Sequence, residues 1–118
     1  MDFEAIEKGK QNYLSPEEIN RLLLDLYNGD LLSKKLSLKV IEYLKNCEDT
    51  AGLPHLIPEE VAIAHKTGTL DYVRGDAGII FGKKPIFITV LVENFSEIPE
   101  ADKIISTIGK LAFLKFSR

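Results

Sequence analysis

The segment Val61–Thr69 constrains the fold most, because it is an apolar run that ends abruptly in a polar tip. It reads Val-Ala-Ile-Ala-His-Lys-Thr-Gly-Thr, which is typical of a buried β-strand that closes with a lysine, two hydroxyls and a glycine. No other apolar run in the sequence ends this way. We therefore expect a strand whose polar end is the candidate site, with the rest of the chain positioning it.

Two further apolar runs, Ala77–Phe81 and Ile86–Val92, are expected to be strands as well. The Gly-Lys-Lys-Pro segment at 82–85 predicts a short hairpin turn, so these two strands should pair antiparallel. The link at 70–76 is longer and predicts a second hairpin with a flexible tip. The three strands should therefore form an antiparallel meander.

Helical spacing of apolar residues predicts three helices around these strands. The first begins at Ser15, where proline and glutamate follow as in a capping box, and ends at Gly29. The second runs from Ser33 to about residue 46, and the last opens at Pro99, with its apolar face at 101, 104, 105, 108, 111 and 112, and ends near Phe116. Leucines and isoleucine at 53, 56 and 57 should pin the loop before the first strand. The order predicts an α+β fold with the helices packed on the sheet in two layers.

The strand Ile86–Val92 is apolar at nearly every position, as if both of its faces were covered. As the last strand of a meander it would also be an edge strand, and soluble proteins avoid long apolar edges. We therefore expect another strand of the parent protein, or a second copy of the chain, to pair with it.

Length and composition limit the classes of function. A chain of 118 residues with 45% apolar content should form one domain or a large piece of one, so 1–118 is expected to be a single partial domain. The net charge of −3 and the absence of a basic stripe argue against nucleic acid as a partner. One cysteine (Cys47) and two histidines (His55, His65) exclude a disulfide framework and argue against a metal site, and no cofactor is expected. The first residues do not resemble a signal peptide, and no apolar run is long enough to span a membrane.

The polar tip suits an anionic ligand that docks along a strand edge. Side chains alternate along a strand, so Lys66 should point to one face while Thr67 and Thr69 place hydroxyls on the other. Gly68 lets a ligand lie close to the backbone. A lone Lys-Thr-Gly tripeptide is more often a polar strand end that turns into solvent, so the surrounding sequence has to decide between these interpretations.

That surrounding sequence resembles the C-terminal part of the class A serine β-lactamases and their penicillin-binding-protein-like relatives. Lys66-Thr67-Gly68 matches the Lys-Thr-Gly motif on their active-site strand. The Ser-Pro helix start, the Leu53-Pro54 pair before the strand and Gly78-Ile79-Ile80 after it occur in the family's order. The resemblance extends from about Glu4 to the final helix, and Glu4-Ala5-Ile6 resembles the tail of the loop that carries the deacylating glutamate.

The family also uses Ser-x-x-Lys and Ser-Asp-Asn motifs, and neither is present in this sequence. None of the six serines is followed by a lysine three residues later. The chain is therefore expected to supply one wall of the active site and to be inactive alone. Glu4 should not be assigned the deacylating role, because the chain is expected to begin just after that glutamate.

The resemblance implies roles for the residues of the tip. Lys66 would maintain the positive field around nucleophile and substrate, and the hydroxyls of Thr67 and Thr69 would bind the substrate carboxylate. The Thr69 N–H would form half of an oxyanion hole. Arg74, in the predicted turn, could replace the family's carboxylate-binding arginine, but solvent exposure is the favoured prediction for it. His65 could line the site or pack beside the motif, and a substrate contact by any of Asp71, Tyr72 and Asp76 in the same turn is the less favoured prediction.

The parent protein would hydrolyse β-lactams through an acyl-serine, and would be exported as the family typically is. A non-catalytic binding or scaffold module is an alternative. A related peptidase or esterase of the same superfamily, which acts on a peptide-like small molecule, is another.

Overall fold

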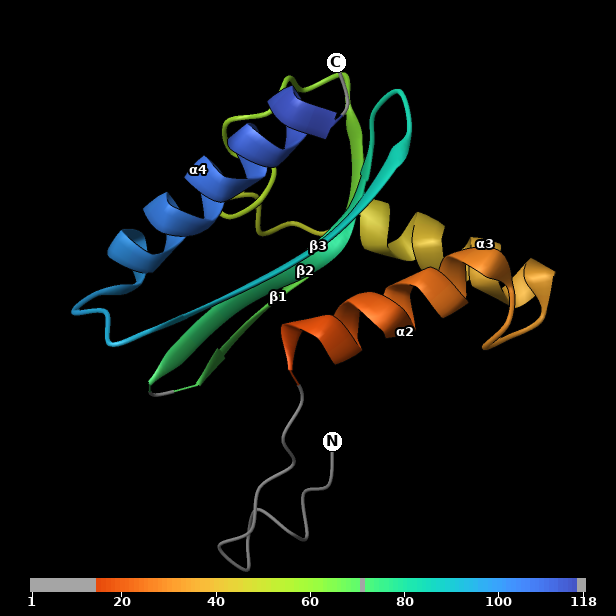
Figure 1. Cartoon of the computed structure of the whole chain (residues 1–118), viewed down its shortest axis with the longest axis horizontal. Helices are drawn as coiled ribbons and strands as arrows, with labels where there is room; N and C mark the ends of the chain where they lie inside the picture. The colour runs from red at the N-terminus through yellow and green to blue at the C-terminus, as the bar shows by residue number, and fades with distance from the viewer. Residues whose placement is uncertain (1–14, 71, 117–118) are drawn as a thin grey trace, which may run out of the picture.

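The computed structural model describes residues 15–70 and 72–116, and in this part helices cover both faces of one antiparallel sheet (Figure 1). In chain order the elements are α2 (Pro16–Asn28), α3 (Lys34–Lys45), β1 (Ala62–Leu70), β2 (Val73–Phe81), β3 (Pro85–Glu93) and α4 (Ile98–Phe116). Helices α2 and α3 lie on one face of the sheet and α4 on the other (Figure 1). The α+β class is confirmed, but the expected two layers are three, because the final helix crosses to the opposite face.

The capping residues predicted for α2 and α3 are at the ends of these helices in the structure. Ser15 Oγ accepts from the Glu18 N–H at 3.1 Å, and the Glu18 carboxylate accepts from the Ser15 N–H at 3.1 Å, which completes the capping box. Gly29 ends α2 with φ 77°, a left-handed conformation that favours glycine. Ser33 caps α3 by accepting from the Leu36 N–H at 3.2 Å.

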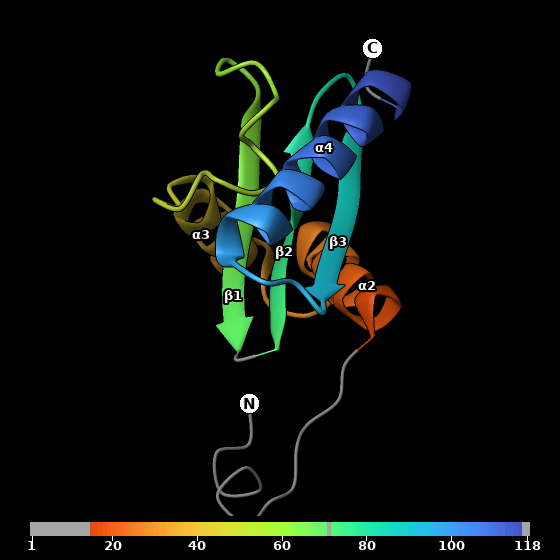
Figure 2. The same ribbon diagram turned by 90° about the vertical axis from the view of Figure 1, so that its left-hand side faces the viewer.

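The strand order is β1-β2-β3, so the meander is confirmed and both β1 and β3 are edges of this sheet (Figure 2). The hairpin predicted at 70–76 is present, but its predicted length is wrong, because β2 begins at Val73, which pairs with Leu70. Arg74 and Asp76 therefore lie within a strand and not in a turn. The start of β2 could not be predicted as a strand, because it contains no apolar run. It forms a strand by pairing with the equally polar tip of β1.

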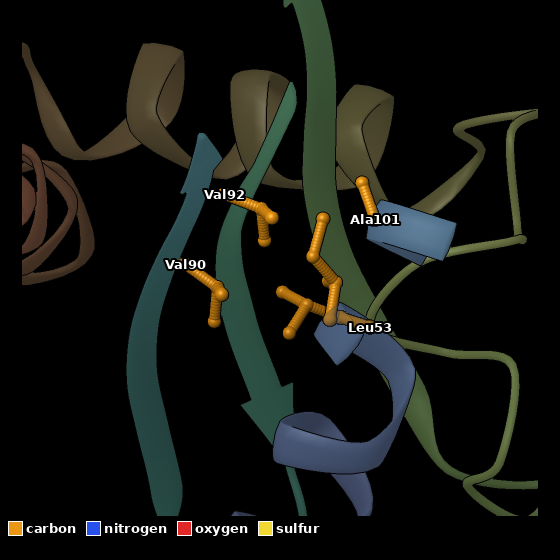
Figure 3. Packing of buried hydrophobic residues seen from close by; sticks show 5 residues of the cluster. Leu53, Val90, Val92 and Ala101 are labelled. Atoms are coloured by element: carbon orange, nitrogen blue, oxygen red, sulfur yellow. The ribbon is translucent and has the colours of Figure 1, made fainter. Parts of the chain in front are cut away.

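Helix α4 and the loop before β1 form the core on one face of the sheet. Leu53, Val90, Val92 and Ala101 converge there with Ile105 (Figure 3). Of the three apolar residues expected to pin the loop, those at 53 and 57 are buried, whereas Leu56 is exposed. These two buried side chains therefore fix the loop against the sheet and α4.

Strand β3 is covered on both faces, as its sequence predicted, by α4 on one side and α2 on the other. On the α2 side, Tyr27 packs edge-on against Phe87 with ring centroids 5.5 Å apart. Asn20 accepts from the Thr89 hydroxyl at 2.6 Å and donates to the Phe87 carbonyl at 3.3 Å. The faces of β3 are thus covered, while one of its edges has no partner strand in residues 15–70 and 72–116.

The predicted apolar face of α4 is partly wrong. Ala101 and Ile105 are buried in the core with β3, and Gly109 is buried against Leu53 of the loop before β1, whereas Ile104, Ile108 and Leu111 are exposed. The helix carries two adjacent apolar stripes, and only one of them contacts the sheet. Among the described residues, none of the helices has the length and apolar character needed to cross a membrane.

Candidate functional site

The polar tip of β1 divides its side chains between the two faces of the sheet. Thr67 shares a face with Ile63, which packs in the core with Ile57 and Ile80, and its side chain is buried on the α4 side. Lys66 alternates to the other face and is exposed. The predicted separation of lysine and hydroxyls is therefore present, and the two faces meet at the edge of β1, which is unpaired among the described residues.

Arg74 is the centre of a hydrogen-bonded cluster on the α4 face. Its guanidinium donates to Asp102 at 2.8 Å, to the Thr69 hydroxyl at 2.9 Å and to Asp49 at 2.9 Å. Asp49 also accepts from the Thr67 hydroxyl at 3.0 Å through the same oxygen, Oδ2. The cluster thus joins the two threonines of the tip to the loop before β1 and to α4.

The expected solvent exposure of Arg74 is wrong, because only 6% of the residue is accessible. Its place in β2 opposite Thr69 turns the side chain toward the carboxylates under α4. A buried guanidinium needs charged or polar partners for its donors, and this one has them in two carboxylates and a hydroxyl. Arg74 therefore lies beside the predicted site and contacts one of its hydroxyls.

The charges of the cluster stabilise one another. The hydrogen bond from Arg74 holds the pKa of the Asp49 carboxyl below its usual range, against the opposing effect of partial burial. Burial acts to lower the pKa of the Arg74 guanidinium, but the hydrogen bonds to Asp102 and Asp49 outweigh burial and raise that pKa. Asp49 and Arg74 are therefore both charged at neutral pH.

His65 and Asp76 form a second, fully buried pair next to the cluster. His65 Nδ1 lies 2.8 Å from one Asp76 carboxylate oxygen and 3.0 Å from the other, and the Leu53 N–H donates to that carboxylate at 2.9 Å. The expected position of Asp76 in a turn is wrong, since it lies in β2 and is only 1% exposed. His65 packs beside the motif, and it also contributes to the lining of an open pocket of about 450 Å³ between β1 and the preceding loop.

The exposed side of the tip carries the lysine and open space. Lys66 Nζ donates to the carbonyl of Thr67 at 2.8 Å. Backbone groups two residues apart in a strand point to the same side, so the Thr69 N–H points to the side where this ammonium lies. A Cβ on Gly68 would meet no atom within 4 Å. A positive charge, a backbone donor and free space are thus brought together.

The described residues do not include a group of side chains that could bind a metal ion. Across 15–70 and 72–116, no three or more histidine, cysteine, aspartate or glutamate side chains gather as a metal site would require. Asp71 and the residues around Glu4 lie outside these ranges.

The sequence matches the model of the beta-lactamase enzyme family over residues 1–116. The chain belongs to the beta-lactamase enzyme family. The curated beta-lactamase VEB-1 of Pseudomonas aeruginosa is 36% identical in a match that covers 87% of this chain and 38% of VEB-1. The chain therefore spans well under half the length of this relative.

Solved beta-lactamases share the fold of the described residues. The TLA-1 extended-spectrum beta-lactamase superposes with a TM-score of 0.84 at 27% identity, over 91% of this chain and 43% of that protein. A class A beta-lactamase from Bacteroides cellulosilyticus superposes with a TM-score of 0.87 over 98% of this chain and 47% of its own, and its 22% identity supports the fold alone. The resemblance to class A enzymes inferred from the sequence is confirmed.

Two residues of the cluster were not anticipated from the sequence. Asp49 lies in an irregular loop and Asp102 near the start of α4, where acidic residues are common. Their contact with Arg74 depends on β2 beginning at Val73, and no local pattern indicated that.

Proposed function

We propose that this chain forms one wall of a serine β-lactamase active site, at the free edge of β1. In this proposal Lys66 supplies positive charge, the hydroxyls of Thr67 and Thr69 bind the substrate carboxylate, and Gly68 leaves room for the substrate against the strand. The observation that carries the proposal is the convergence of the Lys66 ammonium, the Thr69 N–H and the open space at Gly68 on a strand edge that no other described strand pairs with.

The Thr69 hydroxyl is prepared to donate. It accepts from Arg74 at 2.9 Å, so its own hydrogen is left for another acceptor. A hydroxyl that already accepts from a guanidinium is polarised and becomes a better donor to a carboxylate. Through this hydrogen bond, Arg74 would therefore strengthen the binding of the substrate carboxylate by Thr69.

The Thr69 N–H supports a role in oxyanion stabilisation. Acyl transfer from a β-lactam develops negative charge on the carbonyl oxygen, and a fixed backbone N–H beside a lysine is suited to stabilise it. The strand pairing with β2 holds that N–H in place, because Thr69 lies opposite Arg74 in the ladder. The second donor would come from the nucleophilic serine, which this sequence does not supply.

Covalent catalysis needs the Ser-x-x-Lys nucleophile and the Ser-Asp-Asn motif, and the sequence contains neither. We therefore expect the chain alone not to turn over a β-lactam. The test is incubation of the purified chain with a chromogenic cephalosporin, beside the variant Lys66→Ala. The absence of hydrolysis above the variant supports the proposal, whereas hydrolysis by the chain that Lys66→Ala abolishes would show that the chain carries a complete site.

A further inference from the structure

The Thr67 hydroxyl and the Arg74 guanidinium already hold a carboxylate, which is that of Asp49. Asp49 Oδ2 accepts from Thr67 Oγ1 at 3.0 Å and from Arg74 at 2.9 Å. A hydroxyl and a guanidinium that converge on one oxygen are the donors that a substrate carboxylate would use. The loop before β1 thus places an internal carboxylate where the proposed function requires an external one.

A hydroxyl can donate one hydrogen, so Thr67 cannot serve Asp49 and a substrate carboxylate together. Electrostatic repulsion between Asp49 and a substrate carboxylate also opposes their binding at the same time. Asp49 and Asp102 share the single charge of Arg74, which gives these three side chains a net charge of −1. A third carboxylate beside them would meet like charge unless one of the two aspartates moved away.

Asp49 is the aspartate that can move. Its side chain is 40% exposed and lies in the irregular segment between α3 and β1, whereas the Asp102 side chain is 15% exposed and is fixed on α4. The Asp49 carboxylate also accepts a hydrogen bond from the Ala51 N–H at 3.3 Å, and this donor lies in the same loop. Rotation of one side chain toward solvent would free Thr67 and one arm of Arg74.

We propose that Asp49 is a specificity-determining residue that competes with the carboxylate of the substrate for Thr67 and Arg74. The inference rests on the proposed function, because it takes Thr67 as a substrate-binding group. Ligands with a free carboxylate bind only after Asp49 is displaced. Ligands without that charge do not compete with it.

The alternative is that Asp49 only anchors its loop to β1. The two roles differ in the effect of Asp49→Asn, which keeps the size of the side chain and removes its charge. Loss of an anchor weakens folding and leaves binding unchanged or weaker. Loss of a competitor strengthens the binding of carboxylates alone.

The test is a titration of the whole chain with benzylpenicillin and, separately, with its methyl ester, followed by NMR chemical shifts at the tip of β1. The proteins are the unsubstituted chain, Asp49→Asn and the control Asp25→Asn, whose carboxylate pairs with Arg21 on α2 away from the cluster. We expect Asp49→Asn to bind benzylpenicillin about tenfold more tightly, since like-charge contacts strongly oppose binding. The ester should bind all three proteins equally.

Equal or weaker binding of benzylpenicillin by Asp49→Asn would overturn the inference, and so would an equal gain for the ester or the absence of binding to any of the proteins. The control Asp25→Asn should behave as the unsubstituted chain with both ligands. If this inference fails alone, hydrolysis by an enzyme that contains this wall still depends on Lys66. If the proposed function is wrong, hydrolysis by that enzyme does not depend on Lys66, whatever effect Asp49→Asn has on ligand binding.

Discussion

Glycines at and beside the tip of β1 differ in how strongly the fold requires them. A Cβ on Gly68 would meet nothing within 4 Å, whereas a Cβ on Gly78 would collide with the Ala64 carbonyl and lie 2.6 Å from the Cβ of His65. The first glycine is therefore not explained by packing within the described residues. The second is required by the close approach of β2 to β1.

These glycines give a prediction that separates binding from stability. Gly68→Ala should change the free energy of unfolding by less than about 1 kcal/mol, because the methyl group enters open space. It should weaken benzylpenicillin binding if the substrate lies against this strand. Gly78→Ala should destabilise the chain by about 1–3 kcal/mol through overpacking. Urea denaturation and the NMR titration measure the two effects, and a Gly68→Ala chain that binds normally would contradict the assignment of Gly68.

Helix α4 lies against the backbone of the loop before β1. A Cβ on Gly109 would be 2.7 Å from the Leu53 carbonyl oxygen, so a larger residue would push the helix away from the core that both elements share. The same loop carries Asp49, and the adjacent Leu53 N–H holds Asp76. The seating of α4 therefore affects the position of the candidate site.

Gly109→Ala should destabilise the chain, contrary to the usual effect in a helix. Alanine is favoured over glycine by about 1 kcal/mol in a helix interior, but the steric conflict with Leu53 should outweigh this and leave a net loss of about 1–2 kcal/mol. Thr107→Ala, at an exposed position of the same helix, is the matched control and should be close to neutral. Thermal unfolding compares them, and a Gly109→Ala chain as stable as the control would show that α4 adjusts freely.

Elements with a strong local pattern were predictable from the sequence. The Ser15 capping box, the Gly29 helix end and the apolar β3 strand each carry a signal within a few residues, and each is present in the structure. The start of β2 was not predictable, because Val73–Asp76 is polar and glycine-containing. Its strand conformation comes from pairing with β1, which is a tertiary effect.

Some features of the candidate site were also predictable from the local sequence, whereas others were not. The position of Lys66, Thr67 and Thr69 on opposite faces follows from strand alternation, and sequence alone predicted it. The burial of Arg74 and its contact with Asp49 depend on segments 25 residues apart. No local pattern encodes such a contact, so the cluster became visible only in the folded chain.

At the scale of the whole molecule, the sheet has an apolar edge strand that is unpaired on one side among the described residues. Strand β3 is apolar, lies at the end of the sheet and has an unpaired side in the described residues. The match covers 38% of VEB-1, so the chain spans well under half the length of that relative. We propose that β3 pairs with a second copy of the chain or with the remainder of the parent protein.

Association through β3 is tested by sedimentation at several concentrations. The unsubstituted chain should form a dimer. Ile88→Pro is not a suitable variant, because proline removes a backbone N–H from β3 and would disturb its pairing with β2. Leu91→Lys places charge on an exposed position of the strand and should shift the chain toward monomer. A clean monomer at high concentration of the unsubstituted chain would exclude self-association and leave the parent protein as the partner.

The central claim is that the tip of β1 is the substrate-binding wall of a beta-lactamase, and a chimera tests it most directly. This chain would replace the matching segment of VEB-1, which supplies the remainder of the enzyme. Hydrolysis of a chromogenic cephalosporin is then measured for the chimera, for Lys66→Ala and Thr69→Val, and for Lys83→Ala in the exposed β2–β3 turn as a control.

We predict that the chimera hydrolyses the cephalosporin and that Lys83→Ala leaves kcat/KM unchanged. Lys66→Ala and Thr69→Val should each lower kcat/KM by about 10- to 100-fold, because a hydrogen bond to a charged group contributes about 1.5–3 kcal/mol and 1.4 kcal/mol is a factor of ten. A folded chimera that is inactive, or one that keeps full activity in Lys66→Ala and Thr69→Val, would contradict the claim.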